Sequence, residues 1–290
     1  KKLWTEDQAG APIRLYAAFN EIDEAQFVVE RLREWVHEGH RRDSIAILYR
    51  SNAQSRVFEE LLLSEGIPYR VYGGLRFFER AEIKDALAYL RLISNRHSDP
   101  SFERVVNVPT RGIGARTATA IREHARASDT SMWSAAIELA SKTQIPTRAR
   151  TSLKHFTDLI EALDASTQDL DLTEQTDIVV QRSGLIDHYR KQHGEKAQTR
   201  VENLEELVTA ARHFNYDPAD DQHPDPLSEF LAHAALEAGE GQAEEWEDCV
   251  QLMSLHSAKG LEFPLVFLSG LEEGLFPHQR SIDEPGRLEE

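Results

Sequence analysis

The sequence contains a single cysteine, Cys249, among its 290 residues. One cysteine excludes an internal disulfide framework and any zinc site built on cysteines, and it fits a reducing compartment. We expect Cys249 to be a small buried side chain. The sequence also lacks a run of about 18 apolar residues, which a membrane-spanning helix needs, and its polar first ten residues do not form a signal peptide. A cytoplasmic protein with no membrane partner is therefore expected.

Basic residues are outnumbered: 33 Lys and Arg stand against 50 Asp and Glu, a net charge of −17. Binding of nucleic-acid phosphates needs local positive charge, so the distribution matters more than the total. Glu202–Asp248 holds 14 acidic residues against one base, Arg212. Arg70–Arg96 and Ser101–Arg126 each carry three more positive than negative charges. We expect a polarised surface, with the acidic stretch as a solvated face or a partner site.

The first 73 residues alternate between strand-like and helical patterns. The spacing of apolar residues from Val28 to Val36 predicts a helix, and Ser51 with Gln54 forms a possible capping box before another helix. Short apolar segments predict three strands, at Pro12–Ala18, Ser44–Tyr49 and Tyr69–Tyr72. Strands that alternate with helices imply a parallel sheet with helices packed on its faces.

The middle of the chain has only helical patterns. They cover Ile83–Ile93, Phe102–Val106, Ala115–Ala127, Met132–Ala140, Leu153–Leu163 and Asn203–Phe214. Asp217–Pro226, rich in acids and proline, predicts a mobile loop. Strand character returns at Cys249–Leu255 and Pro264–Leu268. The fold class is therefore α/β, an incomplete parallel-sheet domain (residues 1–73 and 247–290) interrupted by a large all-helical insertion domain (residues 74–246).

A Gly-Ile-Gly turn lies in Asn107-Val-Pro-Thr-Arg-Gly-Ile-Gly-Ala-Arg-Thr-Ala118, between two predicted helices. The two glycines allow a tight turn with Ile113 buried, which leaves amide hydrogens free at the start of the second helix. Such amides bind phosphate oxygens without reading bases. A plain turn between helices is the alternative, but the preceding proline and the neighbouring Arg111, Arg116 and Thr117 favour phosphate binding. The pattern resembles the helix-hairpin-helix motif, which grips a duplex backbone.

A second polar segment, Ser254-Leu-His-Ser-Ala-Lys-Gly-Leu-Glu-Phe-Pro264, lies between two apolar strands. Loops at the carboxyl ends of parallel strands are where α/β proteins place ligand groups. His256, Ser257 and Lys259 are donors suited to phosphate, and Glu262 can accept from a sugar hydroxyl. A lone histidine in such a loop is more often a structural hydrogen bonder, so this segment is ambiguous by itself.

Longer motifs favour a ligand-binding role for this segment, because they resemble those of a known protein family. Leu255-His-Ser-Ala-Lys-Gly-Leu-Glu-Phe263 with Gly270-Leu-Glu-Glu-Gly-Leu-Phe-Pro277 closely resembles motif V of the superfamily 1 DNA helicases of the UvrD, PcrA and Rep family. Four more segments resemble the same family in the same order, beginning at Ala46, Tyr72, Pro109 and Thr199. The resemblance covers essentially the whole chain.

The resemblance implies that residues 1–73 and 247–290 are parts of the second RecA-like motor domain, and that the helical insertion rides on it. By the same resemblance, Glu262 faces the nucleotide. The positions that look like single-strand DNA contacts are Arg50, Asn52, Arg76 and His256. Those that look like duplex DNA contacts are Thr110, Arg111, Gly112, Ile113, Gly114, Arg116 and Thr117.

The parent protein implied by the resemblance is an ATP-dependent 3′-to-5′ DNA helicase that unwinds duplex DNA in repair and replication, with ATP and Mg²⁺ as cofactors. Single-stranded DNA and duplex junctions are the expected partners, together with DNA repair proteins. The Gly-x-x-x-x-Gly-Lys-[Ser/Thr] phosphate loop and the Walker B acids are missing, and the sequence stops before the family's arginine motif. We therefore expect no complete catalytic site, no metal site, no bound cofactor and no ATPase activity in this chain alone.

Two other readings remain. A stand-alone helix-hairpin-helix DNA-binding or base-excision module also uses a Gly-Ile-Gly hairpin, with Asp129 as its carboxylate, but it leaves the strand-rich ends and the motif V loop unexplained. A protein-interaction role for the acidic stretch Glu202–Asp248 is compatible with the helicase reading.

Overall fold

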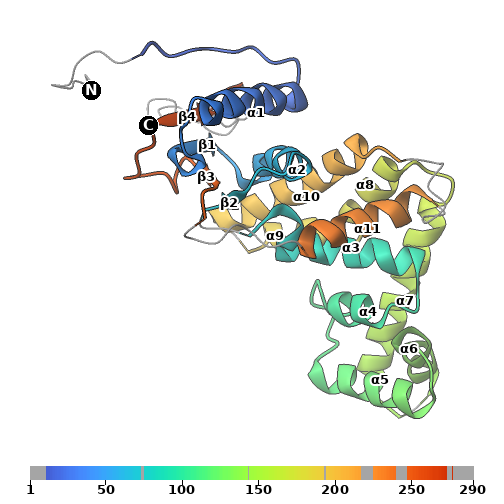
Figure 1. Cartoon of the computed structure of the whole chain (residues 1–290). Coiled ribbons are helices and arrows are strands. Elements are labelled where there is room, and N and C mark those ends of the chain that lie inside the picture. Colours follow the sequence, from blue (N-terminus) through green and yellow to red (C-terminus); the bar gives the residue numbers. More distant parts are fainter. Residues whose placement is uncertain are drawn as a thin grey trace.

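The computed structural model of the chain describes residues 11–72, 75–142, 144–192, 194–216, 225–239, 247–272 and 276. Figure 1 shows two lobes, one built around a sheet and one in which the described residues are helical. We call them the sheet lobe and the helical lobe. The predicted fold class, a parallel α/β domain interrupted by a helical insertion, is confirmed.

In the described part of the chain the sheet has four strands in the order β2-β3-β1-β4, and all neighbouring strands are parallel. The strands are β1 (Ile45–Tyr49), β2 (Tyr69–Val71), β3 (Val250–Ser254) and β4 (Leu265–Leu268). They confirm the strands predicted near residues 44–49, 69–72, 249–255 and 264–268. Because β1 and β3 come from opposite sides of the insertion in sequence, the sheet closes only when the two chain segments meet.

Strand β1 is buried along its whole length, as its apolar sequence predicts. Ile45, Ile47 and Tyr49 pack in one cluster with α1 (Glu21–His37) and α2 (Ser55–Ser64), on one face of the sheet. Ala46 and Leu48 face the opposite way, against Met253 and the loop that follows β3. Among the described residues, helices therefore cover one face of the sheet and a loop covers part of the other.

Local signals set the ends of these helices. The Asn20 side chain accepts a hydrogen bond from the Asp23 amide and caps the start of α1. Ser51 and Gln54 form the expected capping box, which closes the 3-10 turn η2 (Asn52–Gln54) directly before α2. Two further 3-10 turns are η1 (Arg42–Ser44) and η3 (Phe77–Glu79).

The strand predicted at Pro12–Ala18 is wrong. Residues 11–18 have no regular secondary structure, and Ile13 and Leu15 are 98% and 90% exposed. A strand requires a neighbouring strand to pair its backbone groups, and no described strand lies beside this segment. Tyr16 instead stacks on Phe27 of α1, with ring centroids 3.8 Å apart.

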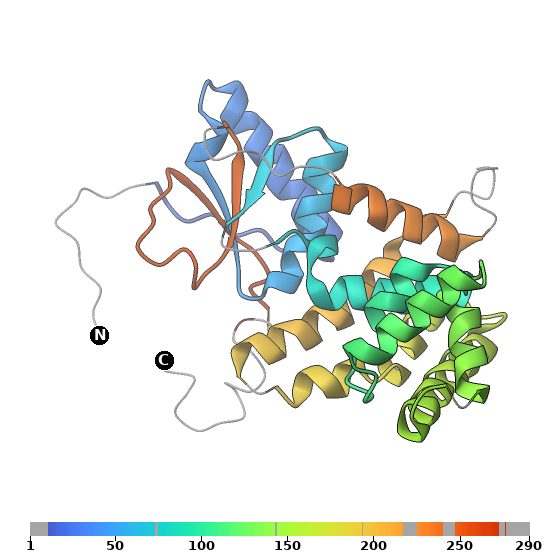
Figure 2. The ribbon, with the colours of Figure 1, turned by 90° about the horizontal axis from the view of Figure 1, so that it is seen from below.

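Among the described residues, the helical lobe contains the six predicted helices and three that the patterns did not predict. The six are α3 (Ala81–Ser94), α4 (Asp99–Val105), α5 (Ala115–Ala127), α6 (Met132–Ser141), α7 (Thr147–Thr167) and α10 (Glu195–His213). The others are α8 (Leu172–Arg182), α9 (Leu185–Arg190) and α11 (Pro226–Gly239). Figure 1 places α5 and α6 at the end of this lobe away from the sheet, and Figure 2 shows the helical lobe beside the sheet from below.

The helical lobe has its own core. One cluster of buried side chains runs from Phe77 to Ala234 and includes the rings of Phe102, Phe156 and Phe230. Residues 217–224 of the predicted loop lie outside the described residues, but Pro226 is the first residue of α11, and the Asp225 carboxylate accepts from the Ser228 amide. No described helix is long and apolar enough to cross a membrane. Cys249 is buried, as expected.

Buried arginines join the two lobes. Arg56 of α2 is 2% exposed, and its guanidinium donates to Glu206 of α10 at 2.5 Å and to Glu60 at 2.6 Å. Arg80 donates to the Asn52 carbonyl and to the Asn203 side chain, at 2.9 Å each. Part of the acidic stretch therefore belongs to the contact between the lobes, which corrects the expectation that the whole stretch is a solvated face or partner site.

Replacing Arg56 with Met should lower the free energy of unfolding by about 3 kcal/mol, because it leaves Glu60 and Glu206 without their cation in a partly buried place. Arg41→Met is the matched control, since Arg41 is exposed and pairs with exposed Asp43; it should change stability by about 0.5 kcal/mol or less. Urea unfolding followed by circular dichroism measures both. Equal effects of the two substitutions would contradict a role for Arg56 in joining the lobes.

Candidate nucleic-acid interface

The Gly-Ile-Gly turn connects α4 to α5 in the helical lobe. Ile113 is 2% exposed and packs in the core of this lobe, which confirms that it is buried. The Asn107 side-chain oxygen accepts from the amides of Arg111, at 2.8 Å, and Ile113, at 3.1 Å. Asn107 thus holds the turn closed from within. Its position four and six residues before its partners is the signal that sequence reasoning could have used, because asparagine often bonds backbone groups of a following turn.

The two glycines of the turn have different roles. Gly112 has a φ of +80°, in the region that side chains disfavour. Gly114 has an extended backbone, with φ −79° and ψ 175°, and a Cβ there would meet nothing within 4 Å. Only Gly112 is therefore required by backbone geometry, while Gly114 leaves open space in front of the first turn of α5.

The Arg111 side chain is engaged inside the protein. Its guanidinium donates to Tyr89 Oη at 2.5 Å and lies over the rings of Tyr89 and Phe156. Burial raises the pKa of Tyr89 to about 12, so this phenol stays protonated and donates to the Val108 carbonyl. The guanidinium also donates to three main-chain carbonyls, those of Val105, Pro109 and Ser183. The Arg111 side chain therefore stabilises the turn from inside the protein. A direct DNA contact by this side chain stays a prediction.

Unpaired donors lie at the start of α5. The first amides of the helix that bond within it belong to Thr117 and Ala118, which both donate to the Gly114 carbonyl. The amides of Ala115 and Arg116 have no hydrogen-bond partner among the described residues. The Arg116 side chain is exposed, and no ion pair forms with it in the described part of the chain. This arrangement suits an anion.

A further cation reaches the turn from α7. Arg148 is exposed, and its Nε lies 4.0 Å from the position that a Cβ would take on Gly112. It has no ion-pair partner among the residues that the structure describes. Sequence reasoning missed Arg148 because 36 residues separate it from Gly112, and no local pattern signals the contact.

A pocket of about 490 Å³ adjoins the turn. Thr110 and Arg111 line it from one side, and His188 and Lys191 of the α9 region line it from another, together with Asp187. Thr110 is exposed and Thr117 is partly exposed. All seven residues predicted to contact duplex DNA lie on or beside this turn. The Ile113 side chain packs in the core of the helical lobe.

Three of the four predicted single-strand contacts, Arg50, Asn52 and His256, lie at the carboxyl edge of the sheet. Parallel pairing places Tyr49 beside Ser254, and the Leu255 amide donates to the Tyr49 carbonyl at 2.8 Å. The residues that follow each strand, Arg50 and Asn52 after β1 and His256 after β3, therefore emerge at the same edge. Their side chains are partly or fully exposed, and none has a hydrogen-bond or ion-pair partner among the described residues.

Arg76 and Glu262 differ from these three residues in their surroundings. Arg76 is 4% exposed, and its Nε lies 3.4 Å from Glu79. A contact between Arg76 and DNA would require this side chain to leave its buried place, so it stays a prediction. Glu262 is exposed in the loop three residues before β4, and its role toward a nucleotide also stays a prediction.

The basic segments form less positive surface than their charge count suggests. In Arg70–Arg96, Arg76 and Arg80 are buried, and Arg96 pairs with Asp164 at 2.8 Å. In Ser101–Arg126, Arg104 pairs with Asp85 at 2.7 Å, and Arg122 pairs with Glu103. The polarised surface expected from local charge therefore reduces to a few cations, of which Arg116 is one.

Gly112→Ala should destabilise the protein by about 1–2 kcal/mol, because alanine disfavours a positive φ. Gly114→Ala is the matched control; its backbone suits any residue and it lacks close neighbours, so it should leave stability unchanged or raise it by about 0.4–1 kcal/mol. Urea unfolding of both variants measures the difference. Two equal losses would contradict the assignment of the turn's strain to Gly112.

Comparison with known proteins agrees with this architecture. A family model described as UvrD-like helicase C-terminal domain matches residues 1–290. The chain is 59% identical over 290 residues to DNA helicase II of Escherichia coli (strain K12) and 41% identical over 297 aligned positions to ATP-dependent DNA helicase PcrA of Bacillus subtilis (strain 168). Each alignment covers all of this chain and 40% of the relative, so the chain spans about two fifths of these proteins' length. The chain belongs to the UvrD-like helicase C-terminal domain family.

Proposed function

We propose that this chain is the DNA-handling part of an ATP-dependent 3′-to-5′ DNA helicase that acts in repair and replication. The observation that supports this most is the α4–α5 turn, which carries the amides of Ala115 and Arg116, unpaired among the described residues, and the exposed cation Arg116, with the exposed Arg148 beside Gly112. Amides and cations bind phosphate without reading sequence. The turn would hold the duplex, as helicase action at any sequence requires.

The sheet edge supplies the second contact in this proposal. Arg50, Asn52 and His256 offer three donors along one edge, at the ends of adjacent parallel strands. A single strand would run across this edge, while the duplex ahead of it contacts the helical lobe. The names of the relatives, which are DNA helicases, support DNA as the partner. DNA repair proteins are further proposed partners, for which the exposed part of the acidic stretch is a suitable surface.

ATP and Mg²⁺ are proposed as cofactors of the whole protein. The residues of this chain do not by themselves fit an ATP–Mg²⁺ site, because the sequence has no phosphate loop. Glu262 would contribute one exposed carboxylate toward a nucleotide held mainly by other parts of the protein. The chain alone is accordingly proposed to have no ATPase activity.

A base-excision activity finds no support in the geometry. Asp129, its candidate carboxylate, follows the far end of α5, a helix of 13 residues that begins at the turn. At a rise of about 1.5 Å per residue, roughly 20 Å separates the two ends. Asp129 therefore does not stand beside the turn on which this alternative depends.

The hairpin proposal predicts a change in salt dependence. The double substitution Arg116→Ala and Arg148→Ala should weaken binding of the nucleotide-free protein to a duplex junction. It should also reduce the slope of log K against log salt by about 0.9 for each phosphate that the variant no longer neutralises. Lys154→Ala, which removes a paired lysine from the same helix as Arg148, is the matched control. Fluorescence anisotropy at several salt concentrations measures the slope, and an unchanged slope would refute phosphate binding by these two arginines.

The sheet-edge proposal predicts a separate effect on single strands. His256→Ala should weaken binding of single-stranded DNA several-fold, since it removes one phosphate donor worth about 1 kcal/mol, and should leave junction-duplex binding nearly unchanged. His155→Ala, an exposed histidine on α7, serves as control. If both histidine variants bind single-stranded DNA with the same affinity as the unmutated protein, His256 does not contact the strand.

A further inference from the structure

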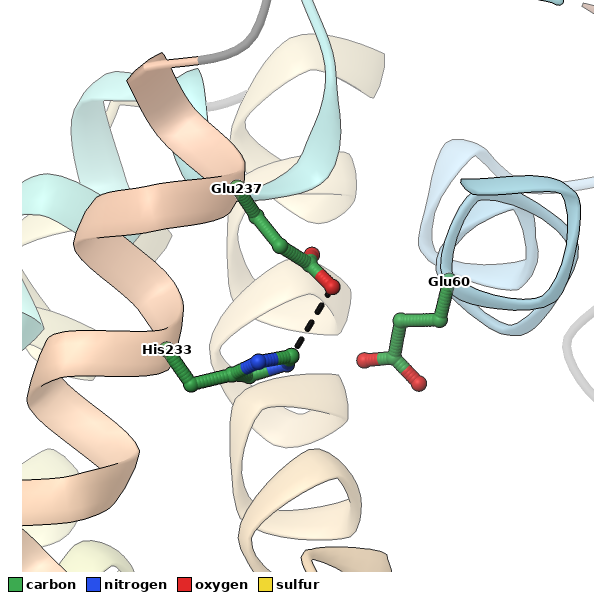
Figure 3. Close-up of side chains that lie close together, drawn as sticks. All are labelled: Glu60, His233 and Glu237. Atoms are coloured by element: carbon green, nitrogen blue, oxygen red, sulfur yellow. Dashed lines mark ion pairs between the residues drawn. The ribbon is translucent and has the colours of Figure 1, made fainter. Parts of the chain in front are cut away.

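A group of three potential metal ligands lies where the two lobes meet. His233 and Glu237 are on α11 of the helical lobe, and Glu60 is on α2 of the sheet lobe. Figure 3 shows the imidazole and both carboxylates turned toward one another across the space between the two helices. One donor atom from each residue lies within 4.8 Å of those of the other two, and His233 Nε2 is 3.1 Å from Glu237 Oε1.

The ligand positions follow from the sequence and the packing. His233 and Glu237 are four residues apart, so they share one face of α11. Phe78 and Phe214 pack against the imidazole, with centroids 6.1 and 5.5 Å from it. Arg56 pairs with the Glu60 carboxylate at 2.6 Å. All three side chains are therefore held in place and only partly exposed.

Negatively charged groups outnumber positively charged ones around His233. Glu229, one turn earlier on α11, also acts electrostatically on His233, which makes three carboxylates around one imidazole. One oxygen of Glu229 is buried and has no hydrogen-bond partner among the described residues. Arg56, which pairs with Glu60, is shared with Glu206. A divalent cation would balance this excess, whereas a proton on His233 balances it only in part.

The geometry points to a transition-metal site formed by Glu60, His233 and Glu237, of the kind that takes Zn²⁺. One nitrogen and two carboxylate oxygens are ligands that Zn²⁺ accepts, with a water in the fourth position. At metal–ligand distances of about 2.0–2.2 Å, tetrahedral ligands stand roughly 3.3–3.6 Å apart. His233 and Glu237, 3.1 Å apart, are slightly closer than this, and all three donor atoms lie within 4.8 Å of one another, so small rotations of the side chains would bring them to this spacing.

A metal at this place would connect the lobes. Two ligands come from the helical lobe and one from the sheet lobe. The ion binds fully only when α11 and α2 hold this arrangement, so it stabilises the arrangement by mass action. Its function would be to fix the position of one lobe on the other.

Titration of the purified, nucleotide-free protein with Zn²⁺ in a calorimeter tests the site. We expect one Zn²⁺ per chain, with binding at least tenfold weaker in Glu60→Gln and in His233→Gln. Glu138→Gln is the matched control, because Glu138 also stands 3.0 Å from a histidine, His124, but lacks a third ligand. This variant should bind Zn²⁺ as tightly as the unmutated protein.

Thermal unfolding supplies the second measurement. Zn²⁺ should raise the Tm of the unmutated protein and of Glu138→Gln. It should not raise the Tm of Glu60→Gln or His233→Gln. The melts without metal show whether each variant is folded; if His233→Gln is not, Glu60→Gln and Glu237→Gln decide the result. Absence of Zn²⁺ binding, or binding that folded variants retain, would overturn the site. Equal competition by Mg²⁺ would overturn it too, because Mg²⁺ prefers oxygen ligands.

Discussion

The hydrogen bonds of the Arg80 guanidinium are the constraint on which the relation between the two lobes depends. This buried side chain donates to the Asn52 carbonyl, the Ser55 hydroxyl and the Asn203 amide oxygen. Asn52 stands at the carboxyl edge of the sheet, and Asn203 lies on α10 of the helical lobe. A guanidinium has five fixed donors, so it orients several groups at once. Arg80 thereby ties the position of the proposed single-strand contacts to the helical lobe that would hold the duplex.

Much of the fold is predictable from periodicity, because apolar spacing reports which face of an element is buried. Strand β1 and helix α5 follow directly from such patterns. Pro12–Ala18 shows the limit, since an apolar segment becomes a strand only when another strand pairs with it. Helix α11 shows another, because it begins at the proline that ended the predicted acidic loop. A proline is tolerated in the first turn of a helix, so it marks a start as readily as a break.

The candidate site was predictable where it depends on local sequence and not where it depends on packing. The turn, the burial of Ile113 and the open first amides of α5 follow from Gly-Ile-Gly. The inward orientation of Arg111 does not, because its partners Tyr89 and Ser183 are distant in sequence. Charge counting failed for the same reason, because an arginine adds unpaired surface charge only if no carboxylate or carbonyl engages it.

The central claim is that main-chain amides and a few cations bind DNA phosphates on an otherwise acidic protein. Hydrogen–deuterium exchange with each form of DNA tests it most directly, because exchange reports the amides themselves. A duplex junction should slow exchange at Ala115 and Arg116, and a single strand should slow exchange at residues 50–52 and 255–257 without affecting the turn. Unchanged exchange at Ala115 and Arg116 with saturating duplex junction would contradict the account.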